Sequence, residues 1–312
     1  MKKVSIIGSG NVGTNTAFFL AENGTASVTL VDVKPGVPTG KALDLMEAGP
    51  LRGYDINIKG YDQVGSIEGS DVVVIAAGRV RKPGEQRIDL FLDNAAIVKS
   101  VCEDIKKITP NAVVVNVVEP IDSLTLVAQE ALGFPRERVL GVGGLLTSTR
   151  IRFLVSNELK ISPREVTALV IGPHRKSMVV LRDTVRVSGI PAAELIGAQK
   201  LDTIVEIVRA AGDTILELAQ HSTSFYAPSA AVVGLVEAIC RDTHAILPVA
   251  MRLDGEYGVK DLAVGVPAQI GLGGVEKVLK LKLQESEQAE FRTAVDELRA
   301  AIEQARRRQS AS

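Results

Sequence analysis

The 312-residue sequence is poor in cysteine, histidine and tryptophan, and these shortages exclude several classes of protein. Its two cysteines, Cys102 and Cys240, lie far apart in segments with a helical pattern. They indicate ordinary buried thiols in a reducing compartment rather than a disulfide framework. With three histidines and no pair of cysteines, the sequence has no ligand spacing typical of a metal site, so we expect no bound metal.

Long apolar runs and an excess of charge are also missing. No apolar run approaches the roughly 20 residues of a membrane-spanning helix. The formal net charge of -1 gives no reason to expect nucleic acid or a membrane as a partner. We interpret the basic tail, residues 306–308, as the solvated, frayed end of a last helix. These observations favour a cytoplasmic protein.

The first half of the chain does contain a regular alternation of strand and helix patterns. Short runs rich in valine and isoleucine are flanked by glycines and separated by helical patterns, which is typical of parallel strands buried on both faces. The expected strands cover residues 3–7, 27–33, 71–77 and 112–118, and the expected helices cover 11–23 and 87–107. The pattern predicts an α/β protein with a Rossmann-type doubly wound parallel sheet over residues 1–143, whose ligands bind beyond the carboxyl ends of the strands.

The second half, residues 144–312, follows a different pattern. Two strand-like runs flank the loop that carries His174. The remaining expected elements are helices at 148–158, 201–219, 228–241 and 286 to about 307, a capped turn at 162–165, and a strand-rich section at 245–269 with turns at 254–255 and 257–258. No linker or repeat separates the halves, so we expect a second α+β substrate-binding domain packed against the first.

A glycine-rich loop, Gly8-Ser9-Gly10-Asn11-Val12-Gly13, follows the first strand and opens the first helix. Its first glycine permits a tight turn, the second lets a pyrophosphate approach the backbone, and the third lets the helix pack on the strand. Asp32 lies at the end of the second strand, where a carboxylate hydrogen-bonds a ribose and repels a 2′-phosphate. The pattern predicts NAD rather than NADP, and a cap for the turn at residues 34–36 is the alternative role of Asp32.

The segment after the third expected strand is unusually cationic. Arg79, Arg81, Lys82 and Arg87 lie within nine residues, in a loop expected at the carboxyl end of the sheet. Four basic side chains in such a loop favour an anionic ligand. Charge alone would fit a solvated, mobile loop equally well.

At this point the sequence resembles the lactate/malate dehydrogenase family, nearly from end to end. The resemblance is carried by Gly36 to Leu45, Arg81-Lys82-Pro83-Gly84 with Arg87, Pro120-Ile121-Asp122, Arg150, His174, and Tyr226-Ala227-Pro228. It implies an NAD-dependent dehydrogenase of a small dicarboxylate that forms homodimers or homotetramers. It also adds Asn94, Val117 and Glu119 to the expected cofactor site.

The resemblance implies a role for each residue of the substrate site. Arg81 stands where an arginine binds the second carboxylate of malate, whereas lactate enzymes usually carry glutamine there. Arg87 matches the arginine that polarises the carbonyl, and Arg150 matches the one that holds the C1 carboxylate. His174 matches the residue that takes the hydroxyl proton while a hydride passes to the nicotinamide. The implied reaction interconverts malate and oxaloacetate.

Four departures from the family pattern fall on the chemistry itself. Thr147 replaces the aspartate that should orient His174, and Glu119 replaces an asparagine that should contact substrate and nicotinamide. Pro173 replaces a glycine, and Arg175-Lys176 replace a Gly-Asp pair. A threonine hydroxyl can accept a hydrogen bond from the ring but cannot stabilise imidazolium by charge. In a protease triad, loss of the orienting carboxylate costs about 10⁴ in rate.

These departures leave two expectations open. The first is an active malate dehydrogenase with an altered relay. The second is a diverged relative that binds NAD but turns malate over slowly, or acts on another 2-oxo acid. We expect Arg175 and Lys176 to disfavour the protonated imidazole. Glu119 could compensate by reaching His174, and we expect it to form an ion pair with an arginine in the free protein.

Overall fold

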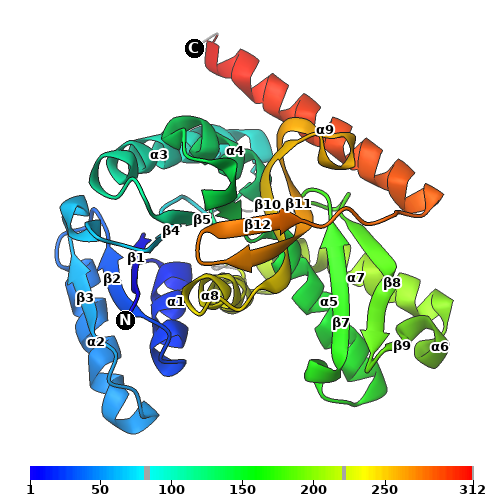
Figure 1. Cartoon of the computed structure of the whole chain (residues 1–312), viewed down its shortest axis with the longest axis horizontal. Coiled ribbons are helices and arrows are strands. Elements are labelled where there is room, and N and C mark those ends of the chain that lie inside the picture. The colour runs from blue at the N-terminus through cyan, green and yellow to red at the C-terminus, as the bar shows by residue number, and fades with distance from the viewer. Residues whose placement is uncertain (81–84, 220–222, 311–312) are drawn as a thin grey trace.

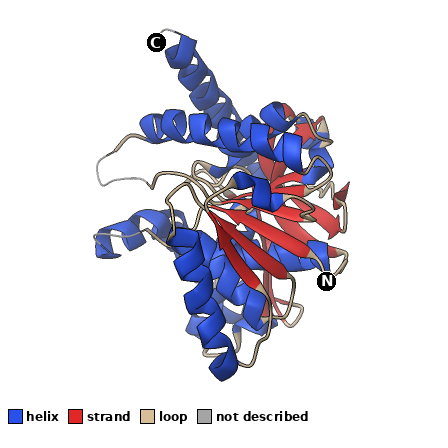
Figure 2. Cartoon of the chain, turned by 90° about the vertical axis from the view of Figure 1, so that its left-hand side faces the viewer, coloured by secondary structure: helices blue, strands red, loops and turns tan. Residues whose placement is uncertain are grey.

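A computed structural model describes residues 1–80, 85–219 and 223–310 of the chain. Nine strands form one sheet in the order β12-β11-β10-β6-β5-β4-β1-β2-β3, and helices lie on both sides of it (Figure 1 and Figure 2). These strands are β1 (Lys3–Ile7), β2 (Ser27–Val31), β3 (Ile58–Tyr61), β4 (Val72–Ile75), β5 (Val113–Asn116), β6 (Val139–Gly141), β10 (Ala245–Asp254), β11 (Lys260–Gly271) and β12 (Gly274–Val278). Strands β1 to β6 pair in parallel, which confirms the expected Rossmann-type sheet.

The helices occupy both halves of the chain. They are α1 (Asn11–Glu22), α2 (Val37–Arg52), α3 (Arg87–Ile108), α4 (Ile121–Leu132), α5 (Gly143–Leu159), α6 (Ala192–Ile196), α7 (Ala198–Ala219), α8 (Tyr226–Cys240) and α9 (Glu285–Ser310). A second sheet contains β7 (Val166–Ile171), β8 (Val179–Val187) and β9 (Ile190–Pro191). It lies beside α5, α6 and α7, at the right of Figure 1.

The valine-rich strands form the centre of the core, as their composition predicts. All four residues of β4 and all four of β5 are buried. Val72 and Val74 belong to one apolar cluster, whereas Val73 and Ile75 belong to the cluster on the other face of the sheet. Because alternate side chains point to opposite faces, a continuous apolar run is what a strand covered on both sides requires.

Several elements differ from the expected ones. Strand β2 ends at Val31, before the expected residue 33, because Asp32 bonds to the nucleotide loop and to Lys34. Helix α5 begins at Gly143, five residues earlier than expected. The helices α2 and α4 and the strands β3 and β6 were not predicted. In α2, prolines stand in the first turn and at position 50, which hides its helical pattern in the sequence.

The second half extends the first sheet instead of forming only a separate layer. Strand β10 pairs with β6 through Ala250 and Gly141, and β11 and β12 follow in antiparallel order. The predicted turns between β10 and β11 are present, with φ of 105° at Gly255 and 75° at Gly258. The expected boundary at residues 143 and 144 stays our proposal for the division of the chain, but one sheet contains strands from both sides of it.

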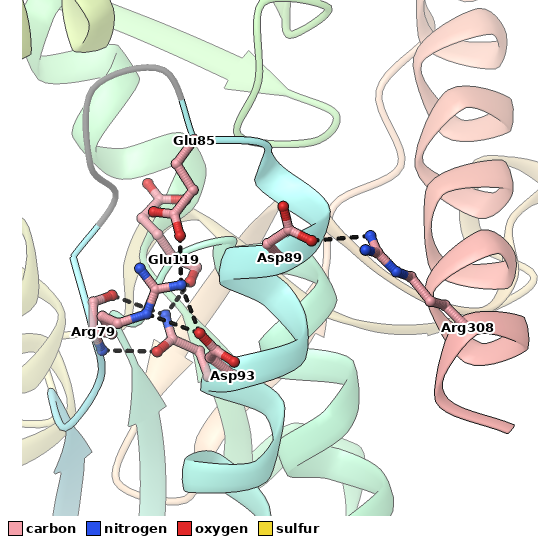
Figure 3. A network of polar contacts seen from close by, with 7 residues as sticks. Arg79, Glu85, Asp89, Asp93, Glu119 and Arg308 are labelled. Carbon is pink, nitrogen blue, oxygen red and sulfur yellow. Dashed lines mark hydrogen bonds and ion pairs between the residues drawn. The ribbon is translucent and has the colours of Figure 1, made fainter. Parts of the chain in front are cut away.

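The basic tail is the exposed end of the last helix, as predicted, but the prediction that it is frayed was wrong for the described residues, because they stay helical. Helix α9 continues to Ser310, and its apolar face packs on the core through Leu298, Ile302 and Ala305. An arginine near its end, Arg308, lies 2.9 Å from Asp89 in the first turn of α3. The tail is therefore connected to α3 through this ion pair, as Figure 3 also shows.

Both cysteines are free thiols, as predicted. Burial raises the pKa of Cys102 to about 12 and that of Cys240 to about 11, so neither is a reactive thiolate. Within the described residues, no helix is both long enough and apolar enough to cross a bilayer.

Candidate active site

The glycine-rich loop makes a sharp turn between β1 and α1. Gly8 has φ of 107°, and a Cβ there would lie 2.5 Å from the Ala77 nitrogen. A Cβ on Gly13 would lie 1.9 Å from the Gly8 carbonyl oxygen, so this glycine lets the helix approach the strand. A Cβ on Gly10 would meet nothing within 4 Å. The open space at Gly10 is where the sequence predicts the pyrophosphate.

Asp32 is bonded to the same loop. Its carboxylate accepts hydrogen bonds from the Ser9 backbone nitrogen at 2.8 Å and from the Ser9 hydroxyl at 3.0 Å. Burial alone would raise the pKa of Asp32, but these donors and the Lys34 nitrogen bring the pKa below its usual value. The Lys34 bond, at 3.2 Å, is the turn cap that stood as the alternative role. Asp32 is therefore a turn cap that remains ionised beside the glycine-rich loop, and its ribose contact stays a prediction.

His174 follows strand β7, in a loop fixed at its start by Gly172. Gly172 has φ of 85°, and its nitrogen donates to the Gly265 carbonyl of β11 at 2.9 Å. The His174 side chain is 12 % exposed. It lies at one wall of a pocket of about 220 Å³. The loop thus presents the imidazole to a cavity while keeping most of the ring away from solvent.

Thr147 holds one nitrogen of the imidazole. Its hydroxyl lies 3.0 Å from His174 Nδ1 and 3.3 Å from the Gly143 carbonyl oxygen, one turn earlier in α5. If the hydroxyl donates to that carbonyl, it accepts from Nδ1-H, and Nε2 is then the nitrogen free to exchange a proton. The residue at the family's aspartate position therefore still orients the ring, but without a negative charge.

Glu119 lies on the other side of the ring. Its Oε1 is 3.5 Å from His174 Nε2, and its Oε2 accepts from the Ile121 nitrogen at 3.3 Å. The predicted approach to His174 is confirmed. Among the described side chains, no arginine forms the ion pair that we expected with Glu119. The negative charge of Glu119 does act on Arg150, where it opposes the lowering of the pKa by burial. The carboxylate thus faces Nε2, the ring nitrogen on the side away from Thr147.

Arg150 is the arginine of the expected substrate site whose side chain the structure describes. It stands on α5 one turn after Thr147 and lines the same pocket. Burial lowers the pKa of Arg150, and the negative charge of Glu119 opposes that effect. A cation that is costly to bury gains most from an anionic ligand, so the pocket suits a carboxylate near α5.

The pocket lies where the sheet predicts it. The cavity is lined by Val12 after β1, by Ala76 and residues 78–80 after β4, and by residues 117–119 after β5. These segments leave the carboxyl ends of parallel strands, where ligands of doubly wound sheets bind. Val12 and Val117, both expected at the cofactor, are thus beside His174.

The structure describes part of the cationic loop. Arg81 and Lys82 lie outside the described residues, as does the side chain of Arg87, so their predicted roles stay predictions. Arg79 does not offer its charge to a ligand, because it lies 2.6 Å from Glu85 and 2.6 Å from Asp93 (Figure 3). The expectation of four basic side chains for an anion was wrong for this one.

Asn94 ties two loops of the site together. It is fully buried, and its amide oxygen accepts from the Arg79 nitrogen at 2.7 Å. Its amide nitrogen donates to the Arg79 carbonyl at 3.0 Å and to the Glu119 carbonyl at 2.8 Å. The residue expected at the cofactor therefore fixes the backbone beside it, and a direct cofactor contact stays a prediction.

The positive charges after His174 are partly compensated. Lys176 Nζ lies 3.0 Å from Asp213 Oδ2, and the charge of Arg175 acts on Asp122. The predicted effect of both cations on the imidazole is therefore weakened by neighbouring acids.

Asp122 is a site residue to which sequence reasoning gave no role, although it belongs to the Pro120-Ile121-Asp122 segment that carries the resemblance. It is 3 % exposed, and its Oδ2 accepts from the His174 backbone nitrogen at 2.6 Å. The sequence contained one further clue, an acid within the apolar helix α4, three residues after Glu119. An isolated acid in the first turn of a helix is common, so this clue alone does not identify a site.

One group of possible metal ligands lies far from this pocket. Asp242, His244 and Glu276 place ligand atoms within 4.8 Å of one another on the surface. His244 Nδ1 is 2.8 Å from Glu276 Oε2, and this hydrogen bond raises the pKa of His244. The three side chains are already paired with one another, and sequence spacing had not indicated the group.

Together, the sheet, the glycine-rich loop and the histidine pocket define a dinucleotide-binding α/β protein with an acid-base site. The chain belongs to the lactate/malate dehydrogenase family. The family's model "lactate/malate dehydrogenase, NAD binding domain" matches residues 2–141, and its "alpha/beta C-terminal domain" matches residues 145–309. The matched first domain is an NAD-binding domain, which confirms the cofactor predicted from Asp32.

Individual relatives support the same conclusion. The chain is 44% identical to a malate dehydrogenase of Thermomicrobium roseum over 302 residues, which covers 97% of each chain. It is 44% identical to a malate dehydrogenase of Methanosarcina mazei over 287 residues, covering 92% of this chain and 94% of that one. The crystal structure of Cryptosporidium parvum malate dehydrogenase superposes with a TM-score of 0.95 at 35% identity, covering 98% of this chain and 99% of that one.

Proposed function

We propose that the chain is an NAD-dependent malate dehydrogenase, which transfers a hydride reversibly between malate and NAD to give oxaloacetate and NADH. One observation carries the proposal: His174 and Arg150 line one pocket beside an NAD-binding domain, in a chain 44% identical to malate dehydrogenases along nearly its whole length. Family membership makes the reaction class firm, and the dicarboxylate substrate follows from the named relatives.

The residues of the nucleotide loop fit NAD. The space beside Gly10 admits a phosphate close to backbone nitrogens at the start of α1, where the helix dipole favours an anion. The lowered pKa of Asp32 keeps a carboxylate in position for a ribose and against a 2′-phosphate. We assign cofactor binding to residues 8–13, Asp32 and Val117, with Asn94 and Glu119 at its nicotinamide end.

We assign a task to three described residues of the pocket. Arg150 binds the C1 carboxylate of malate, and its guanidinium fork orients the substrate. His174 Nε2 takes the C2 hydroxyl proton, while Thr147 fixes the ring through Nδ1. When bound, NAD supplies the carbon that accepts the hydride. Arg81 for the second carboxylate and Arg87 for the carbonyl complete the proposal.

A second candidate function is a family member with weak malate activity or with another 2-oxo acid as substrate. Two observations favour it: Thr147 gives the imidazole no charge, and the Glu119 carboxylate occupies the space 3.5 Å from Nε2. An anion there repels a dicarboxylate and must move before the substrate hydroxyl can reach the ring. Glu119 is 44 % exposed, so solvent lies beside it and it has room to turn.

The test is NADH oxidation with a panel of 2-oxo acids. We expect oxaloacetate to give the highest kcat/KM, at least about tenfold above pyruvate, because an arginine rather than a glutamine meets the second carboxylate. A higher kcat/KM for any monocarboxylate would replace malate by that substrate class. NAD binding measured by calorimetry without turnover on any acid would establish the second candidate.

The remaining expectations join this proposal. We place the enzyme in the cytoplasm, where malate oxidation serves the tricarboxylic acid cycle, and we expect a homodimer or homotetramer. Exposed apolar side chains on two helices, Leu43 and Met46 on α2 and Ile207 on α7, support an assembly of copies.

A further inference from the structure

Asp122 is the buried ionisable group beside the site to which the reaction as described assigns no task. Its Oδ2 is bonded to the His174 nitrogen, whereas its Oδ1 has no hydrogen-bond partner among the described residues. Burial of an unpartnered carboxylate oxygen is costly, and such groups are retained where they serve a purpose. Asp122 does not line the pocket, so direct contact with a substrate is not that purpose.

The surroundings of Asp122 connect it to the histidine and to little else. Burial raises the pKa of Asp122 to about 7, against the backbone hydrogen bond from His174 and the charge of Arg175. The charge of Glu119 raises it further. Arg175 and Glu119 are thus two charged side chains whose fields reach Asp122. Gly143, at the start of α5, lies between Asp122 and His174, and a Cβ there would be 3.0 Å from His174 Cβ and 3.9 Å from Asp122 Oδ1.

We propose that Asp122 is a positioning residue for His174, which anchors the histidine backbone and supplies from behind the loop the negative charge that Thr147 does not. The hydrogen bond of 2.6 Å fixes the backbone from which the ring projects. The same carboxylate, in a medium of low polarity, favours the imidazolium over the neutral ring. This inference rests on the proposed dehydrogenase reaction, in which His174 must carry the proton.

The first test compares Asp122→Asn with the unmodified enzyme. The amide keeps an oxygen for the His174 nitrogen but carries no charge. Because Asp122 ionises near pH 7, we expect kcat for oxaloacetate reduction to fall about tenfold at about pH 8 and less than about twofold at about pH 6. The KM for oxaloacetate stays within about twofold, since Asp122 does not line the pocket. A loss of kcat that is equal at both pH values would show a structural role and overturn the proposal.

The second test does not depend on turnover. The chain has three histidines, so ring resonances in 15N-histidine spectra are few and are assigned with His221→Gln and His244→Gln. In Asp122→Asn, the midpoint of the His174 ring titration moves to lower pH by about one pH unit. An unmoved midpoint overturns the proposal. If the midpoint moves but the unmodified protein has no malate activity, the role of Asp122 is supported and the proposed function is contradicted.

Asp71→Asn is the matched control. Asp71 also accepts from a backbone nitrogen, that of Lys3 at 2.8 Å, and pairs with Lys2 at the other end of the sheet. Its loss leaves the His174 titration and kcat unchanged. If Asp122→Asn fails to fold, the proposal is tested by a pH titration of the unmodified protein. We expect its His174 backbone amide resonance to follow the ionisation of Asp122, with a midpoint near pH 7. A constant amide resonance from about pH 5 to about pH 9 overturns the proposal.

Discussion

At the scale of single residues, one imidazole stands between three oxygen-bearing side chains. Thr147 lies at Nδ1, Glu119 faces Nε2, and Asp122 holds the backbone nitrogen of His174. A family member with aspartate at position 147 would place its charge behind the ring, away from the substrate. In this chain the Glu119 carboxylate lies 3.5 Å from Nε2, on the side of the ring where we propose that the substrate binds.

Restoring the charge behind the ring tests this view. In Thr147→Asp we expect kcat for malate oxidation to rise at least about tenfold, within the 10⁴ that a protease triad loses with its carboxylate. Thr147→Val, which keeps the shape but removes the hydroxyl, lowers kcat because Nδ1 loses its partner. Steady-state kinetics of both variants measure the effect. Equal rates in the aspartate variant and the unmodified enzyme would mean that the ring is supported in another way.

Removing the Glu119 charge beside Nε2 tests substrate binding rather than proton transfer. In Glu119→Asn we expect the KM for oxaloacetate to fall about tenfold, because the variant no longer repels a dicarboxylate at Nε2. Asp213→Asn is the control, since Asp213 also lines the pocket but is paired with Lys176. If both variants lower KM alike, net charge rather than the position of Glu119 governs binding.

The residues of the site were only partly predictable. His174, Thr147 and Arg150 were found by resemblance, because their neighbours in sequence carry the motif. The role of Asp122 was missed because it depends on a contact across 52 positions of sequence. Arg79 was misjudged for a similar reason, since Asp93, which neutralises it, stands in the second turn of another element, α3.

At the scale of elements, the turn from β1 into α1 contains one glycine that we expect to matter for stability and another that we expect to matter for NAD binding. Gly13 packs against Gly8, whereas Gly10 faces open space. We expect Gly13→Ala to destabilise the fold by at least about 3 kcal/mol, as overpacking against a backbone atom does. Gly10→Ala leaves the melting temperature unchanged but weakens NAD binding at least about tenfold.

Thermal unfolding and calorimetric titration with NAD distinguish these effects. A Gly10→Ala protein that binds NAD normally would remove the glycine-rich loop from the proposed cofactor site. An unchanged melting temperature in Gly13→Ala would contradict the close packing at Gly8.

Elements with a simple pattern were predicted well, and those with interrupted patterns were not. Strands β4 and β5 are continuous apolar runs buried on both faces, so composition alone identifies them. Helix α2 contains two prolines and begins after a glycine with φ of 77°, which gives it the composition of a loop. The pairing of β10 with β6 is a contact between segments that are distant in the sequence, so local sequence patterns do not predict it.

At the scale of the whole molecule, one sheet crosses both halves of the chain, and the pocket lies between them. Residues of the first half, such as Glu119, meet residues of the second, such as His174, across this pocket. A site assembled from both halves depends on their fixed arrangement, which the shared sheet provides.

The proposed assembly is a prediction at this scale. We expect sedimentation equilibrium to give a species of two or four chains of 33.1 kDa. Leu43→Lys on α2 places a charge on an exposed apolar side chain and should weaken the assembly, whereas Val33→Lys, at a side chain 90% exposed in a loop, serves as control. A single-chain species at micromolar concentration would contradict the proposal.

The most direct measurement is the effect of His174→Asn on turnover and on cofactor binding in the same preparation. The predicted result is a loss of oxaloacetate reduction by at least about 10³, with the dissociation constant of NADH unchanged within about twofold. His244→Asn, a change at a surface histidine paired with Glu276, keeps full activity in parallel. Turnover that survives in His174→Asn would contradict the assignment of proton transfer to this imidazole.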